Sequence, residues 1–285
     1  MSQQGLNQLF QNAKEEGNVS AGALAAIQVA DLGEQIQLGL GIEVDQVTAS
    51  EVVLVTQMPD DSGSIRFTAG NAQLVRDGHN LVLDALSASK QKDGILAHTR
   101  YLNGSVLFPF TPLDQAVRMD THNYDPNLGT PLYDQTAVVL ATVLAKAQEF
   151  EDNGVPCRTV TLLITDGNDE HSHVQRPGTI NKLVTDMLKA ERHIIGAMGI
   201  SDGSTDFGMI FSGVPSREIE KARKDGTVNQ LAPKGGMGIH PAWVLTPGSS
   251  QSEIRLAFQV FSQSAVRASQ GAKSFSQAAA GGFGQ

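Results

Sequence analysis

The sequence EVVLVTQMPDDSGS occupies residues 51–64 and joins an apolar run to a loop of small oxygen-bearing side chains. The apolar part, residues 51–58, has the length of one strand and is typical of a strand buried in a sheet. The loop that follows is Asp60-Asp61-Ser62-Gly63-Ser64. In open parallel sheets, ligands bind beyond the carboxyl ends of the strands. We therefore expect this loop to form part of a binding site.

From residue 51 onward, strand patterns alternate with helix patterns, as in an α/β protein whose parallel sheet is covered on both faces. Asn103-Gly104 separates two predicted strands and indicates a tight hairpin, so these two strands should be antiparallel. Ser250 and Glu253 form a capping box for a closing helix. The predicted strands are 52–56, 95–101, 106–110, 159–165, 193–198 and 242–245, and the other main helices are 71–87, 132–150 and 180–192.

The pattern divides the chain into three parts. Residues 1–50 are expected to form two short helices followed by an extended stretch at 36–44. They hold too few apolar residues for a core of their own, so we expect them to pack on the main domain. Residues 51–269 form that domain. The tail, residues 270–285, is composed mostly of Gly, Ala, Ser and Gln, and we expect it to be disordered.

The composition favours a folded, soluble protein: 285 residues, 40% of them hydrophobic, with a net charge of -9. No apolar run approaches the ~18 residues that a membrane span needs, and residues 1–17 lack the pattern of a signal peptide. We expect a cytoplasmic protein that binds neither membrane nor nucleic acid, because phosphate-backbone binding needs clustered Lys and Arg. The single cysteine, Cys157, excludes an internal disulfide, which fits a reducing compartment.

Three loops at predicted strand or helix ends carry hydroxyls and carboxylates. They are Asp60 to Ser64, Gly129-Thr130-Pro131-Leu132, and Thr165-Asp166-Gly167. Without His or Cys, this mixture suits a small hard cation that takes about six oxygens near ~2.1 Å, as Mg²⁺ does. Ser62 and Ser64 are two residues apart, so one loop can aim both hydroxyls at one point, and Asp60 can orient them from behind.

Together, Asp60-x-Ser62-x-Ser64, Thr130 and Asp166 resemble the metal-ion-dependent adhesion site of von Willebrand factor A domains. The element order of residues 51–269 is similar to that family, and the closing helix, with Ser-Glu-Ile-Arg-Leu-Ala-Phe at 252–258, resembles intracellular microbial members. The resemblance implies a Rossmann-like open sheet, mostly parallel, with one antiparallel edge strand and helices on both faces.

The same resemblance implies a ligand set and a way of binding. Mg²⁺ would be held by Ser62, Ser64 and Thr130 directly or through water, and by Asp60 and Asp166 in the first or second shell. Mn²⁺ or Ca²⁺ could replace it. A protein partner would then offer a Glu or Asp to the metal, and family members suggest a MoxR-type AAA+ ATPase or a stress or defence assembly as context. The oligomeric state stays open.

Other interpretations of these residues compete with the metal site. Ser, Thr and Asp are also common turn and cap residues. Asp61 is interpreted as an exposed neighbour, His171 and His173 as a solvated rim rather than a second metal site, and Asp134 as a complement to a helix dipole.

Catalysis is not expected, because no nucleophile elbow, phosphate loop or dinucleotide fingerprint is present. The alternative from another class is a metal-dependent phosphoester hydrolase with His171 or Asp61 as base. A third possibility is a structural, self-assembling protein that uses residues 1–50 or 270–285.

Overall fold

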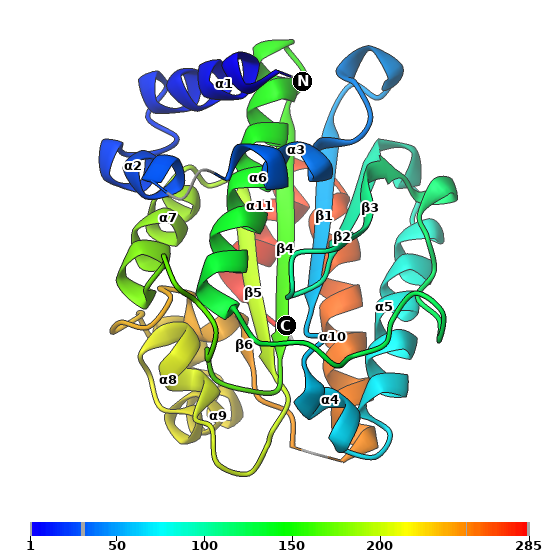
Figure 1. The fold of residues 1–285 in the computed structure, drawn as a ribbon, viewed down its shortest axis with the longest axis vertical. Helices are drawn as coiled ribbons and strands as arrows, with labels where there is room; N and C mark the ends of the chain where they lie inside the picture. The colour runs from blue at the N-terminus through cyan, green and yellow to red at the C-terminus, as the bar shows by residue number, and fades with distance from the viewer. Residues whose placement is uncertain (1, 30–31, 249, 284–285) are drawn as a thin grey trace.

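The computed structural model describes residues 2–29, 32–248 and 250–283. Its centre is a six-stranded sheet in the order β3-β2-β1-β4-β5-β6 (Figure 1). Neighbouring strands are parallel except for the edge strand β3, which pairs antiparallel with β2. The predicted fold class is therefore confirmed. The strands are β1 (Val52–Pro59), β2 (Ile95–Arg100), β3 (Val106–Pro112), β4 (Cys157–Thr165), β5 (His193–Gly199) and β6 (Val244–Leu245).

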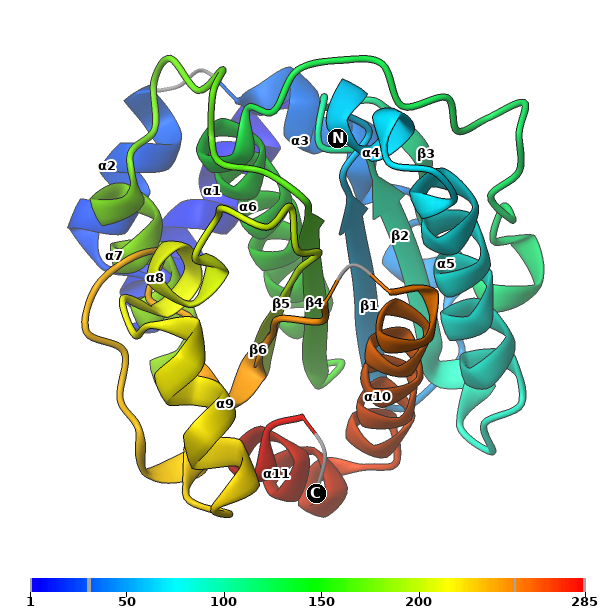
Figure 2. The ribbon, with the colours of Figure 1, turned by 90° about the horizontal axis from the view of Figure 1, so that it is seen from below.

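Helices cover both faces of the sheet. Seen from below, the sheet lies between a layer that contains α6 and a layer that contains α10 and α11 (Figure 2). The long helix α5 packs along α10, where Gly78 makes room for the ring of Phe258; a Cβ at this glycine would lie 2.3 Å from the ring. The helices of this main part are α4 (Gly63–Phe67), α5 (Asn71–Ser87), α6 (Leu132–Asp152), α7 (Pro177–Lys189), α8 (Phe207–Ser212), α9 (Ser216–Lys224) and α10 (Gln251–Ser269).

Three helices within the first 50 residues pack against α6, and the second of them also contacts α7. They are α1 (Gln3–Glu15), α2 (Ala21–Val29) and α3 (Gly33–Leu40), and their apolar side chains belong to the same core cluster as the sheet. Helix α6 is consequently buried on nearly all sides, which explains why its apolar residues do not keep to one stripe.

Part of the prediction for this segment was wrong. Residues 36–40, expected to be extended, belong to the helix α3, which Gly33 begins. The spacing of Ile36 and Leu40, one helical turn apart, places both in the core. The chain then turns at Gly41, whose φ is +64° and whose added Cβ would lie 2.0 Å from the Phe110 carbonyl oxygen.

The tail prediction was also wrong. Residues 272–281 form the helix α11 (Ala272–Gly281) instead of a disordered segment, and Phe275, Ala278 and Phe283 are buried. The Trp243 indole donates a hydrogen bond to the Ala279 carbonyl at 3.1 Å. Composition suggested disorder because polar and small residues dominate, but a few well-spaced apolar side chains suffice to dock one helix. Residues 284 and 285 lie outside the described residues.

Within the described part of the chain, no helix is both long and apolar enough to cross a bilayer.

Candidate metal centre

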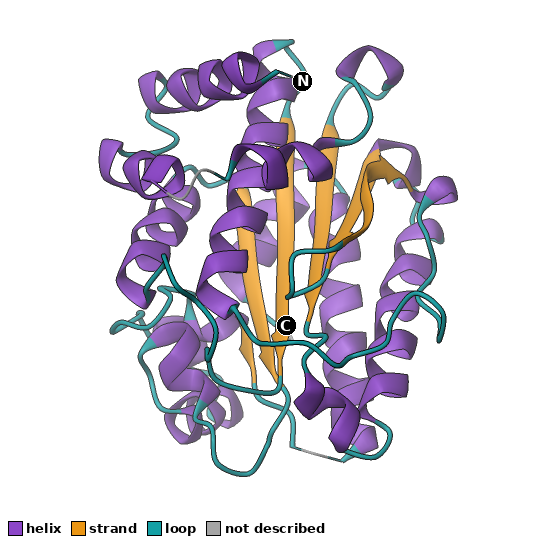
Figure 3. Ribbon diagram, viewed as in Figure 1, coloured by secondary structure: helices purple, strands orange, loops and turns teal. Residues whose placement is uncertain are grey.

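Two of the three predicted loops start from adjacent strands. β1 and β4 are parallel neighbours, and Pro59 at the end of β1 pairs with Ile164 near the end of β4. The loops that follow them, and the loop that leads into α6, lie toward the same end of the sheet (Figure 3). Parallel pairing thus brings residues that are ~100 positions apart in the sequence to one point.

A chain of oxygen atoms connects the loop after β1 to the loop after β4. The Oγ atoms of Ser62 and Ser64 are 2.8 Å apart, and Ser64 Oγ donates a hydrogen bond to Asp166 Oδ1 at 2.6 Å. Ser62 occupies the N-cap position of α4, yet its hydroxyl makes no capping bond. A residue chosen only as a cap would direct its oxygen to the helix amides. The Ser62 hydroxyl faces Ser64 instead, which favours the ligand interpretation over the cap interpretation.

Asp60 lies behind this chain and is fully buried. Its Oδ1 accepts the Ser62 amide at 2.7 Å, and its Oδ2 accepts the Thr165 hydroxyl at 2.6 Å and the Asp166 amide at 3.4 Å. Burial raises the pKa of Asp60, and the hydrogen bonds from Ser62 and Thr165 partly oppose that rise. Asp60 therefore links the ends of β1 and β4 and orients Ser62 and Asp166 from below.

Thr130 lies on a loop that is attached to the serine loop through Leu128. Leu128, two residues earlier, forms a bridge with Ser62 and accepts the Gly63 amide at 3.1 Å. Thr130 is buried, and its amide donates to His171 Nδ1 at 2.9 Å. Within the described residues, the Thr130 hydroxyl has no hydrogen bond to Ser62, Ser64 or Asp166. Four of the five predicted residues are thus directly connected, and the fifth lies on a loop attached to them.

The carboxylates of the site repel one another. Burial and the nearby Asp60 raise the pKa of Asp166 to about 6, although the hydrogen bond from Ser64 opposes the rise. A divalent cation would relieve this repulsion, and hydroxyl and carboxylate oxygens are the donors that Mg²⁺, Mn²⁺ and Ca²⁺ accept. No group of three or more His, Cys, Asp or Glu side chains among the described residues is placed to hold a metal. A cation here would therefore depend on the serine hydroxyls.

Asp61 differs from its prediction. It was expected to be exposed, but its side chain is buried, and both carboxylate oxygens accept hydrogen bonds from Asn103. Its carbonyl accepts the amides of Asn127 and Leu128 at 3.0 and 3.2 Å. Burial raises the pKa of Asp61 to about 7, opposed by the Asn103 amide and increased by the charge of Asp60. Asp61 thus connects the β2–β3 hairpin and the 127–128 loop to the serine loop.

Two supporting residues were not recognised in the sequence. Tyr124 donates its hydroxyl to the Asp60 carbonyl at 2.5 Å, and Asn103 holds Asp61. Asn103 was assigned only to a turn, and Tyr124 lies in an irregular segment with no pattern to mark it. Both contacts span more than 40 residues, so no local signal could have revealed them.

The polar loop beside the site is organised by Asp134. Its carboxylate accepts the amides of His173, Val174 and Gln175 at 2.8, 3.2 and 2.6 Å. Asp134 therefore shapes this loop in addition to lying near the start of α6. His171 and His173 are exposed, as predicted for a rim.

No protein-family model and no curated protein sequence matches this chain. Similar solved structures include proximal thread matrix protein 1 from the mussel byssus, at 16% identity and a TM-score of 0.44, with 74% of this chain and 47% of that chain covered. The pilus adhesin SpaC of Lactobacillus rhamnosus GG has 10% identity, a TM-score of 0.48, and coverages of 76% and 31%. Manganese-loaded TRAP of Plasmodium vivax has 16% identity, a TM-score of 0.40, and coverages of 74% and 74%. The chain thus spans less than half the length of the first of these structures.

Proposed function

We propose that this chain is a von Willebrand factor A type module that binds a protein partner through a divalent metal ion, with Mg²⁺ as the resident ion. The observation that supports this most directly is the oxygen chain formed by Ser62, Ser64 and Asp166 at the ends of two parallel strands. The donor chemistry fits a hard cation. Ser62, Ser64 and Thr130 would hold the ion with Asp166, and Asp60 would orient them.

The bound ion would supply an electrophilic position for one carboxylate of the partner. The chain's own residues would keep that position in place: Asp60 anchors the serine loop to β4, and Asp61 anchors the same loop to the β2–β3 hairpin. A rigid donor set limits the entropy lost on binding. As the partner class, we propose a protein that presents Asp or Glu, in the setting of an AAA+ ATPase or a microbial stress or defence assembly.

Binding is favoured over hydrolysis by the state of the two candidate bases. Both carboxylate oxygens of Asp61 are engaged by Asn103, and the Nδ1 atom of His171 accepts the Thr130 amide. A general base must lie within hydrogen-bond reach of the water that it activates. Asp61, at 4% exposure, is shielded from solvent, and the acceptor nitrogen of His171 is occupied. We therefore propose a non-enzymatic role.

Metal and partner binding can be tested separately. Calorimetric titration of the metal-stripped protein with Mn²⁺ should show one site, and Ser62→Ala and Asp166→Ala should weaken it at least about tenfold by removing a donor. Asp93→Ala, at an exposed position, serves as the control and should leave the titration unchanged. Partner recovery from a cell extract should require Mg²⁺ and fail in EDTA. Equal recovery of the same partner by all variants, with and without EDTA, would contradict metal-mediated docking.

A further inference from the structure

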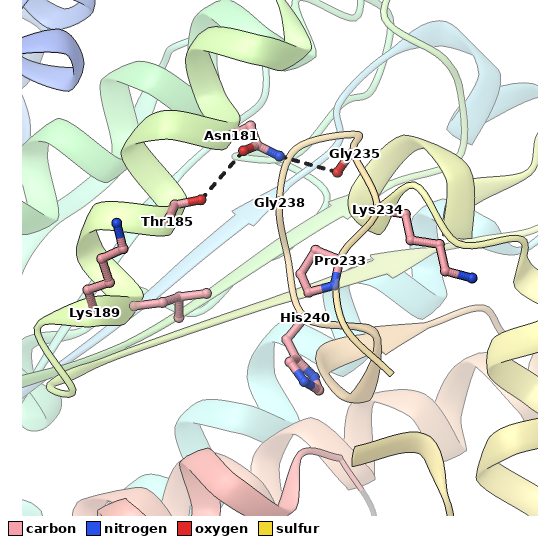
Figure 4. Close-up of a pocket in the computed structure, with 9 residues that line it drawn as sticks. Asn181, Thr185, Lys189, Pro233, Lys234, Gly235, Gly238 and His240 are labelled. Atoms are coloured by element: carbon pink, nitrogen blue, oxygen red, sulfur yellow. Dashed lines mark hydrogen bonds between the residues drawn. The ribbon is translucent and has the colours of Figure 1, made fainter. Parts of the chain in front are cut away.

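Two hollows meet at His240, away from the serine loop. The first, of about 630 Å³, lies between α7 and the loop 233–240 (Figure 4). The second, of about 370 Å³, lies between the end of α7, the start of β5 and α11. Leu188 and His240 line both hollows, so the two are adjoining parts of one depression. Each has the volume of a small-molecule site.

The second hollow has a rigid, largely apolar wall. Trp243 is 4% exposed, and its indole is fixed by the hydrogen bond to the Ala279 carbonyl. Ile194 and Leu188 also line this hollow. On α11 the lining positions carry only the small side chains of Ser276, Ala279 and Ala280. Larger residues there would fill the space, so the small ones leave room for an apolar group beside the indole.

Two histidines line this wall, and one of them, His240, can offer it a polar atom. His193 is buried at 2% exposure; its Nδ1 pairs with the Thr159 hydroxyl at 2.8 Å, and its Nε2 has no partner among the described residues. That atom is buried out of reach of a ligand, so His193 lines the hollow without offering it a polar atom. His240 Nδ1 accepts the Ala242 amide at 3.2 Å, so in the neutral ring Nε2 carries the proton and is a donor. Burial lowers the pKa of both rings, which keeps them neutral.

One cation remains for a charged ligand group. Lys234 lines the first hollow, but it pairs with Glu218 at 3.0 Å, and its side chain is directed away from Thr185 in Figure 4. Lys189 also lines this hollow, and in the described part of the chain no ion pair engages it. Glu191, on the rim of the second hollow, is exposed and would disfavour an anion there. The charges therefore place an anionic end near Lys189 and an apolar end beside Trp243.

We propose that this depression binds a small carboxylate with an apolar body, such as a short fatty acid or an arylalkanoate. The apolar body lies against Trp243 and the small side chains of α11, a polar atom of the ligand accepts from His240 Nε2, and the carboxylate faces Lys189. Glu191, His193 and His240 all line the second hollow, but no group of three or more His, Cys, Asp or Glu side chains among the described residues is placed to hold a metal ion, so an organic ligand fits better. This site is independent of the proposed metal site. It includes His193, at the amino end of β5, whereas the metal site lies beyond the carboxyl ends of β1 and β4.

Trp243 is the only tryptophan of the chain, so its fluorescence reports on the site. Octanoate and 4-phenylbutyrate should each produce a saturable change in the fluorescence of the wild-type protein. Octanamide, which has the same alkyl chain but no charge, should bind the same site more weakly than octanoate does. Lys189→Gln should weaken octanoate binding about fivefold and leave octanamide binding unchanged. The matched control is Lys182→Gln on the same helix, at an exposed position outside the lining, which should have no effect.

Filling the hollow tests its location. Ala279→Leu should abolish the binding of both probes, and Ser276→Leu on the exposed rim should weaken it without risk to the core. Circular dichroism checks that each variant is folded. As a measurement that needs no variant, octanoate should shift the NMR signal of the Trp243 indole N–H. The proposal is overturned if neither carboxylate gives a saturable response, if Lys189→Gln and Lys182→Gln behave alike, or if both leucine variants bind as the wild type does.

Discussion

Exchanging the side chains of Asp61 and Asn103 tests how the serine loop is held. In the wild type, Asp61 Oδ1 accepts the Asn103 amide at 3.0 Å, and Asp61 Oδ2 accepts the Asn103 side-chain N–H. Asp61→Asn keeps the shape but sets two NH₂ groups against each other, and Asn103→Asp sets two carboxylates against each other. The double exchange restores a donor facing an acceptor, with the direction of the bond reversed.

The magnitude follows from the burial of Asp61. Asp61 is 4% exposed, so each single variant leaves a buried polar group without a suitable partner, which costs about 1–3 kcal/mol. Because the double exchange restores the bond, its cost should be smaller than the sum of the single costs, with a coupling of about 1–3 kcal/mol. The Asn103 side-chain oxygen accepts the Ser105 amide at 2.6 Å, and the carboxylate introduced by Asn103→Asp can still accept it.

Urea unfolding followed by circular dichroism gives the three free-energy changes, and Mn²⁺ titration gives the effect on the metal site. We expect both single variants to weaken Mn²⁺ binding and the double exchange to recover most of it. If the two single costs add without coupling, the Asp61–Asn103 contact does not hold the loop. Normal Mn²⁺ affinity in destabilised single variants would show that the contact supports the fold but does not position the ligands.

Three further predictions concern stability. His98 is fully buried, and burial lowers its pKa to about 3. An unfolded histidine has a pKa of about 6.5, so the unfolded state takes up a proton first as the pH falls. Acid therefore destabilises the fold between these two pKa values. Between pH 6.5 and pH 5, the unfolding free energy of His98→Gln should therefore fall by about 2 kcal/mol less than that of the wild type. Parallel pH profiles of the two proteins in urea unfolding would argue against a neutral buried ring. Phe283→Ala should cost about 3–5 kcal/mol, because this 2% exposed ring packs 4.7 Å from the Trp243 ring, centroid to centroid; a thermal unfolding midpoint equal to that of the wild type would mean that the end of the chain is not docked. Gly41→Ala should be more costly than Gly17→Ala, since both glycines have positive φ but only at Gly41 would a Cβ meet backbone, and equal losses in chemical unfolding would refute the close approach to Phe110.

The sheet was predictable because its signals are local. Each buried strand is a short apolar run with a polar loop after it, and Asn103-Gly104 identified the one antiparallel pair. The site followed from the same logic: once β1 and β4 are parallel neighbours, residues after their ends must meet. The Ser64–Asp166 contact follows from that topology, whereas the Ser62–Ser64 contact lies within one loop.

The errors arose where distant contacts override local composition. α11 holds few large apolar residues, but Phe275 and Phe283 find a surface made by elements far away in the sequence. Asp61 looks like any loop aspartate until the hairpin residue Asn103 covers it. Neither effect can be read from the neighbouring residues, because the partner lies about 40 or more residues away.

The enclosure of α6 has a practical consequence for anyone who shortens the chain. The ammonium group of Lys146 is buried and donates to the Ile42 carbonyl, and the guanidinium group of Arg100 donates to the Gln35 carbonyl. A chain cut to begin at residue 51 would remove one hydrogen-bond acceptor from each cation and expose one whole side of an apolar helix to water. Such a fragment should aggregate during purification. Domain boundaries drawn from the strand pattern alone are therefore a poor guide for cloning.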